Sequence, residues 1–212
     1  MTKNNNFSAD LLKQGSRAYN LEEVKRSRRL YDPYRGKLRL DWVELPGRHA
    51  PTLKLLRERD MLDASARFIG VERDEETYQG LCAEHGECSR DHAFIRGELE
   101  LLVKGTSLER AGICNWDTEH LSGGEAFRSN LALLWRFALT QAERHEAFAL
   151  IINAGIDRGF SIANFKESLA AHGHVVSDAE LARPGATYGS RPGRPSSRVN
   201  YCIHFGPVLE TP

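Results

Sequence analysis

The stretch at residues 38–74, LRLDWVELPGRHAPTLKLLRERDMLDASARFIGVERD, decides how this chain folds. Apolar and polar residues alternate from Leu38 to Leu45, and the alternation stops at Pro46-Gly47. Alternation that breaks at a Pro-Gly pair is typical of a strand that ends in a tight turn. We therefore expect a strand over residues 38–45, followed directly by a loop.

A helix and a second strand follow in the same stretch. Apolar residues recur with helical spacing over residues 52–62, and Pro51 suits a first helical turn. Residues 67–72 are a short apolar run bounded by charge, which is typical of a buried parallel strand. Asp74 is expected to cap the next helix. The second strand thus ends in an acid, Glu72.

The rest of the chain extends this pattern of strands and helices. We expect strands within 94–103, 111–115, 147–153 and 199–205, and helices over 125–146 and 160–172. Alternating strands and helices predict an α/β fold with a mostly parallel sheet and helices on both faces. Ligands of such sheets bind at the carboxyl ends of the strands.

Composition excludes several classes of protein. The chain has 212 residues, 41% of them apolar and 27% charged, which suits one globular domain. Lys+Arg and Asp+Glu are 29 each, so the net charge favours no polyanion. No apolar run approaches the length of about 20 residues that a membrane span needs. Four Cys without a disulfide-rich pattern predict reduced thiols and a cytoplasmic location.

The order of these elements resembles the class I S-adenosylmethionine-dependent methyltransferases, a Rossmann-like family, over residues 38–205. The resemblance implies a seven-stranded sheet whose last strand is antiparallel, and S-adenosylmethionine as cofactor. It divides the chain into a basic N-terminal arm, 1–37, and a methyltransferase-like domain, 38–212.

The resemblance also implies roles for the residues at the strand ends. Glu72 matches the acid that binds the ribose, and one carboxylate can accept hydrogen bonds from both ribose hydroxyls. Gly97-Glu98, with Leu99, matches the segment beside the adenine. The remaining cofactor contacts would come from the loop after the first strand, namely Pro46, Gly47, Arg48, His49 and Ala50. A nicotinamide-binding domain would need G-x-G-x-x-G in that loop, which is absent.

The segment Asn115-Trp116-Asp117-Thr118 matches the place beside the transferred methyl group. Asn115 and Asp117 are the candidate catalytic residues, because the protein must position the acceptor and a carboxylate can take its proton. DNA amino-methyltransferases usually carry prolines here, and this segment has none. Trp116 either stacks on a flipped base or lies in the core.

Two basic segments suggest an anionic partner, with solvated loops as the alternative. The loop 183–198 carries Arg191, Arg194 and Arg198 without an acid between the first and the last. The segment 25–37 interleaves six cations with Tyr31 and Tyr34, after a short helix expected to open at Asn20. Cations neutralise phosphates and tyrosine rings stack on bases, so nucleic acid is the expected partner.

The sequence therefore predicts an S-adenosylmethionine-dependent methyltransferase acting on nucleic acid. Two alternatives stay open: a methyltransferase-like module that binds without catalysis, and an enzyme that cleaves the cofactor without an acceptor. No metal is expected. The spacing of Cys82, His85, Cys88 and His92 resembles a zinc site, but it leaves little loop to wrap an ion.

Overall fold

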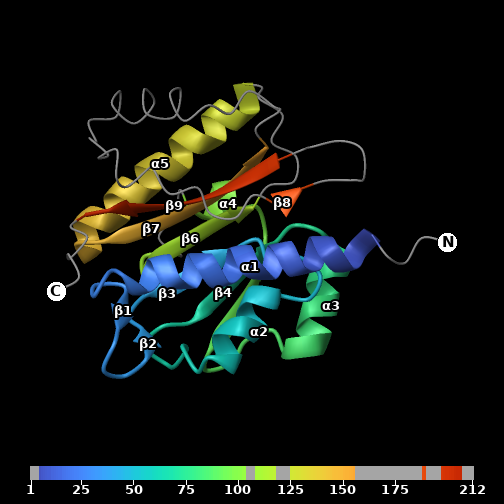
Figure 1. Ribbon diagram of the computed structural model, residues 1–212, viewed down its shortest axis with the longest axis horizontal. Coiled ribbons are helices and arrows are strands. Elements are labelled where there is room, and N and C mark those ends of the chain that lie inside the picture. Colours follow the sequence, from blue (N-terminus) through green and yellow to red (C-terminus); the bar gives the residue numbers. More distant parts are fainter. Residues whose placement is uncertain (1–4, 104–107, 118–124, 156–187, 190–196, 207–212) are drawn as a thin grey trace.

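The computed structural model describes residues 5–103, 108–117, 125–155, 188–189 and 197–206. Its main feature is a seven-stranded sheet with the order β5-β4-β3-β6-β7-β9-β8 (Figure 1). In that order the strands are His92–Arg96, Phe68–Glu72, Asp41–Glu44, Ala111–Asp117, Phe148–Gly155, Ser197–Phe205 and Tyr188–Gly189.

The strands from β5 to β7 run parallel to their neighbours. The long strand β9 runs antiparallel to β7, and the two-residue β8 runs antiparallel to β9. The expected fold, a mostly parallel sheet with an antiparallel last strand, is confirmed.

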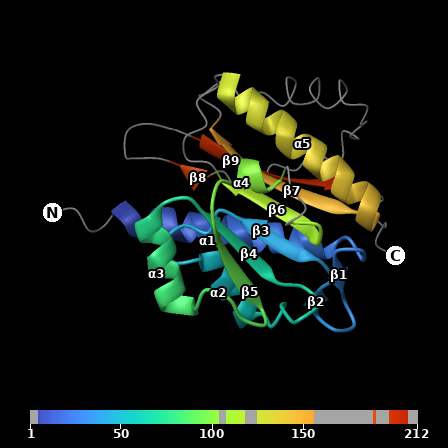
Figure 2. The same ribbon diagram turned by 180° about the vertical axis from the view of Figure 1, so that it is seen from behind.

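Helices cover both faces of the sheet, as Figures 1 and 2 show from opposite sides. Helix α5 (Glu125–His145) and the short α4 (Leu99–Leu102) lie on one face. Helices α1 (Asn5–Lys25), α2 (Pro51–Glu58) and α3 (Glu75–His85) lie on the other. The helix expected over 160–172 lies outside the described residues.

The core has two apolar layers, one on each face of the sheet. Neighbouring residues of a strand point to opposite faces, so Trp42 packs under α1 and α2 whereas Val43 packs under α5. Leu134 and Trp135 of α5 are buried in the layer that contains Val43. A helix with such an apolar stripe is stabilised mainly by this burial.

The N-terminal segment contributes to the same core. Leu21 and Val24 of α1 are fully buried in the cluster that contains Trp42. Asn20, expected to open a helix, lies well inside α1. The domain boundary expected after residue 37 stays a prediction. The contacts of Leu21 and Val24 pack α1 against the sheet.

The first expected strand is two strands. Lys37–Leu38 (β2) pairs with Tyr31–Asp32 (β1) in a small hairpin, and only Asp41–Glu44 (β3) joins the sheet. The backbone N–H of Arg39 donates to Leu30 O at 2.8 Å, which holds the chain in the hairpin before β3 begins. The prediction of one continuous strand over 38–45 was therefore wrong. The alternation of apolar and polar residues continues through Arg39 and Leu40, which separate β2 from β3.

Candidate active site

The carboxyl ends of four parallel strands bring the predicted residues to one edge of the sheet. Glu44, the last residue of β3, is in register with Gly70 of β4 and with Asn115 of β6. The backbone N–H of Gly97, just after β5, donates to Glu72 O at 2.9 Å. The edge thus carries Glu72 and Gly97 on one side of β3, and Asn115 on the other.

The centre of this edge is a buried carboxylate that the sequence analysis did not single out. Glu44 is only 3% exposed, and its Oε2 accepts hydrogen bonds from Trp42 Nε1 at 2.9 Å and Asn115 Nδ2 at 3.0 Å. Burial raises the pKa of Glu44, while the hydrogen bonds from Asn115 and Trp42 oppose this rise. The available signal was an acid near the end of an alternating strand, two residues before Pro46.

Asn115 presents an acceptor to this edge. Its amide nitrogen donates to Glu44, whereas its buried Oδ1 has no hydrogen-bond partner within the described residues. Buried acceptors are nearly always satisfied by protein or water, so this oxygen is available to a donor from water or from a ligand. Asp117 ends β6 in register with Asn153 of β7, two residues beyond Asn115 on the same strand.

Trp116 lies between these two residues and points the other way. Its side chain is fully buried in the apolar layer under α5, together with Phe148 and Leu134. A ring enclosed in the core has no face for a base. The stacking role considered for Trp116 is therefore corrected to the second alternative, a core position.

The loop after β3 approaches the neighbouring strand closely. A Cβ atom on Gly70 would lie 3.1 Å from Pro46 Cγ, so the small residue in β4 makes room for Pro46. Gly47 has φ +60° with open space around it. Ala50 also has a left-handed backbone, and it gives α2 no side-chain cap.

An uncapped helix start suits an anionic group. The first amide groups of a helix lack intrahelical partners, and the helix dipole favours negative charge there. Arg48 is exposed in the same loop, near the carboxylate of Asp74. His49 is directed to α3, where its Nδ1 lies 3.2 Å from Glu84 Oε2.

Glu72 keeps acceptor capacity at the end of β4. Its Oε1 accepts the backbone N–H of Asp74 at 2.8 Å, and its side chain is only partly buried. Asp74 caps α3 as expected, accepting from the backbone N–H of Thr77. Glu98 is exposed beside Gly97, whereas Leu99 is buried in the core.

The predicted arginines fall mostly outside the described residues, as Arg191 and Arg194 do. Arg198 lies in β9, in register with Gly155 at the carboxyl end of β7. That position places its backbone at the same edge as Asp117. The roles assigned to the site residues other than Trp116 stay predictions.

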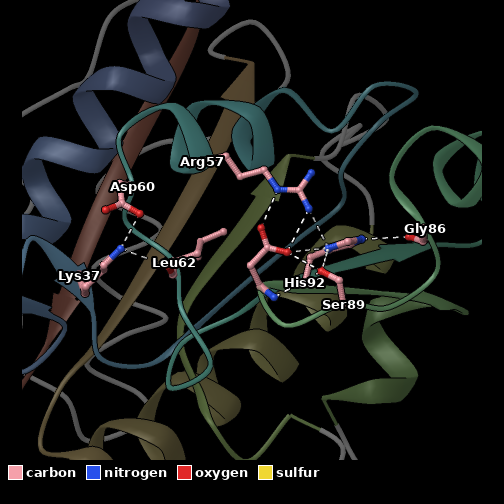
Figure 3. Close-up of polar contacts among 8 residues, drawn as sticks. Lys37, Arg57, Asp60, Leu62, Gly86, Ser89 and His92 are labelled. Atoms are coloured by element: carbon pink, nitrogen blue, oxygen red, sulfur yellow. Dashed lines mark hydrogen bonds and ion pairs between the residues drawn. The ribbon is translucent and has the colours of Figure 1, made fainter.

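The candidate zinc ligands do not converge. Both ring nitrogens of His92 are engaged: Nε2 lies 2.9 Å from Gly86 O, and Nδ1 lies 2.7 Å from Ser89 Oγ and 3.0 Å from Arg57 Nη2 (Figure 3). Within the described residues no three His, Cys, Asp or Glu side chains gather as a metal-binding group. His92 therefore ties the start of β5 to α2.

Comparison with known proteins finds similarity in structure alone. No protein-family model matches the chain, and a search of curated proteins finds no relative. The chain is similar to the N-methyltransferase NodS from Bradyrhizobium japonicum WM9, with 7% identity, 92% of this chain and 97% of that chain covered, and a TM-score of 0.52. It is also similar to the human methyltransferase 10 domain containing protein, with 12% identity, 91% and 82% coverage, and a TM-score of 0.50.

At these identities the likeness establishes the fold. The chain has the Rossmann-like fold of class I methyltransferases, over nearly its whole length. Across the described residues, no helix is both long and apolar enough to cross a membrane.

Proposed function

We propose that this chain, which has the fold of the class I S-adenosylmethionine-dependent methyltransferases, binds S-adenosylmethionine and transfers its methyl group to a nucleic acid. The observation that carries the proposal is the convergence of Glu72, the Pro46–Ala50 loop and Asn115 at the carboxyl edge of one sheet. Fold alone does not imply function, whereas these side chains support a specific chemistry.

The side chains at this edge fit the polar groups of the cofactor. The partly exposed carboxylate of Glu72 suits the two ribose hydroxyls, and that of Glu98 suits the amino group of adenine. The uncapped start of α2 and the exposed Arg48 suit the carboxylate of the methionine end. When bound, the cofactor supplies an electrophilic methyl group.

The protein's own contribution is then to hold the acceptor and take its proton. Asn115 Oδ1 is buried and accepts no hydrogen bond from the described residues, so it can orient an N–H or O–H group of the acceptor. Asp117, two residues along β6, is the proposed proton acceptor. Glu44 holds the amide of Asn115 in place through the 3.0 Å hydrogen bond. The basic segment 25–37 supports nucleic acid as the acceptor.

The test is calorimetric titration with S-adenosylmethionine of the wild type and of two variants. Glu72→Ala is expected to weaken binding at least tenfold without unfolding, because one carboxylate serves both ribose hydroxyls. Glu76→Ala is the matched control, since Glu76 is exposed on the first turn of the adjacent helix α3. Retained affinity in Glu72→Ala would refute the ribose role.

The loop favours a second candidate, a module that binds without catalysis. It has one glycine, and at Ala50 a side chain takes a left-handed backbone that favours glycine. Incubation with labelled cofactor separates the candidates. Transfer of label to RNA or DNA supports the enzyme, whereas binding without transfer supports the module. Breakdown of the cofactor without an acceptor would indicate the third possibility, a cleaving enzyme.

A further inference from the structure

A concave surface lies at the opposite edge of the sheet from the candidate active site. A hollow of about 430 Å³ is lined by Arg28, Arg29, Arg39, Leu40 and His145. Leu40 directly precedes β3, and His145 ends α5 just before β7, so the hollow lies at the amino ends of these strands. In Figure 1 this is the left side, where α1 and α5 end. Its volume is within the range of small-ligand sites.

The lining carries more positive than negative charge. Arg29 pairs with Glu146, and Arg39 Nη2 pairs with Asp32 Oδ2 at 2.9 Å. Arg28 makes no ion pair with any described residue. Three guanidinium groups thus meet two carboxylates. Because the Arg29 pair is exposed on both sides, an incoming phosphate competes with Glu146 at little cost.

A nearby acid does not cancel this charge. Asp41, at the start of β3, is buried and accepts the backbone N–H of Arg67 at 2.8 Å. Its carboxylate also lies 3.9 Å from Arg110 Nε, which is a further cation at this edge. The His145 ring contacts a backbone oxygen and not a carboxylate: its Nε2 lies 2.7 Å from the main-chain O of Glu109.

An exposed aromatic ring stands on the hairpin beside the hollow. Tyr34 is 92% exposed, and among the described residues it is the large apolar side chain that solvent reaches most. Asp32 fixes its turn: Oδ1 accepts the backbone N–H groups of Tyr34 at 3.0 Å and Arg35 at 3.3 Å, while Oδ2 binds Arg39. The Asp32 carboxylate therefore links the turn that carries Tyr34 to Arg39, which lines the hollow.

We infer that this hollow and Tyr34 form a docking surface for a single-stranded nucleic acid. Phosphates occupy the arginine-lined hollow, and an unpaired base stacks on Tyr34. Cations that follow a backbone, combined with an aromatic platform, are what single-strand binding needs. A lone exposed ring beside a concave basic surface does not suit a flat membrane.

The docking surface deepens the proposed function and rests on it for the choice of partner. The two edges are separated by the length of β6, whose seven residues span about 20 Å. A single-stranded nucleic acid docked at the amino edge must therefore run around the domain to reach Asn115. Docking is expected with short strands, and methyl transfer only with longer ones.

Anisotropy of a labelled single-stranded RNA of about 16 nucleotides tests the inference. Arg28→Gln with Arg29→Gln is expected to weaken binding at least tenfold, and to lower the slope of log affinity against log salt by about 1.4. Tyr34→Ala is expected to weaken binding at least fivefold. The control, Arg90→Gln with Arg136→Gln, removes two exposed arginines elsewhere and should change neither quantity.

Three outcomes would overturn the docking surface: equal binding by the Arg28/Arg29 variant and its control, equal binding of a duplex, or equal binding of a mononucleotide. Titration of the same variants with S-adenosylmethionine separates this failure from failure of the proposed function. Loss of strand binding with cofactor binding retained supports a separate docking surface. Cofactor that fails to bind wild-type protein, while the strand still docks, overturns only the proposed function.

Discussion

Replacing Glu44 by alanine would leave two buried donors without an acceptor. Trp42 Nε1 and Asn115 Nδ2 both donate to Glu44 Oε2, at 2.9 and 3.0 Å, and all three residues are buried. An unsatisfied buried donor costs about 1–3 kcal/mol, so the two together cost about 2–6 kcal/mol. That is a large share of a typical stability of about 5–15 kcal/mol.

Glu44→Gln is the matched control for this change. Both hydrogen bonds end on the same oxygen, so a glutamine whose carbonyl takes that place keeps both of them. Its neutral amide also avoids the burial of a charge, and the expected change is below about 1 kcal/mol. Urea unfolding should be followed by far-UV circular dichroism, because the fluorescence of Trp42 responds to the substitution itself.

The pH dependence of the same pair of proteins has a defined sign. Burial raises the pKa of Glu44 above its ordinary value of 4.5. The stability contributed by its protonated form is complete below pH 4.5 and is lost as pH rises through the folded-state pKa. Glutamine cannot ionise, so Glu44→Gln gains stability relative to wild type as pH rises. An unchanged Glu44→Ala protein, or a Glu44→Gln protein as unstable as Glu44→Ala, would refute the reasoning.

Two other substitutions test the packing around the site and the contacts in Figure 3. Gly70→Ala places a Cβ atom 2.6 Å from Phe94 Cδ1, and it should lower the free energy of unfolding in urea by about 1–3 kcal/mol. The control Gly80→Ala, in open space on α3, should instead raise the free energy of unfolding. Equal effects of the two substitutions would contradict close packing at Gly70. The hydrogen bond from Arg57 lowers the pKa of Asp91 below its ordinary 3.8, so this stability is present above pH 3.8 and lost as pH falls. The melting temperatures of wild type and Arg57→Met should therefore converge in acid, and a constant difference would exclude the linkage.

Most of the sheet could be predicted because its strands are short apolar runs. Strands β4, β6, β7 and β9 coincide with such runs, and α5 follows an apolar stripe of helical period. Helix α1 gave no such signal, because much of its buried face is polar. The buried polar residues of α1 and its end are Ser16, Asn20, Glu23 and Ser27.

The centre of the site could not be predicted because it depends on pairing between distant segments. An acid at the end of a strand has several possible surroundings, and only the register of β3 with β6 brings Glu44 to Asn115, 71 residues away. The same holds for the basic hollow. Arg28 and Arg29 belong to a segment that composition marks as basic, but His145 joins them only because α5 returns to the amino edge.

The Glu44–Asn115 pair also bears on the choice between an enzyme and a binding module. Glu44 holds the amide nitrogen of Asn115, while the amide oxygen accepts no hydrogen bond from any described residue and therefore needs a donor from water or a ligand. A ligand that donates an N–H or O–H group to Asn115 would satisfy that oxygen, so the pair is compatible with ligand binding at this edge under either candidate. Catalysis adds a further requirement, a group that takes a proton from the acceptor. Glu44 is enclosed and already accepts two hydrogen bonds through one oxygen, which leaves Asp117, at the end of β6, as the residue on which the distinction turns.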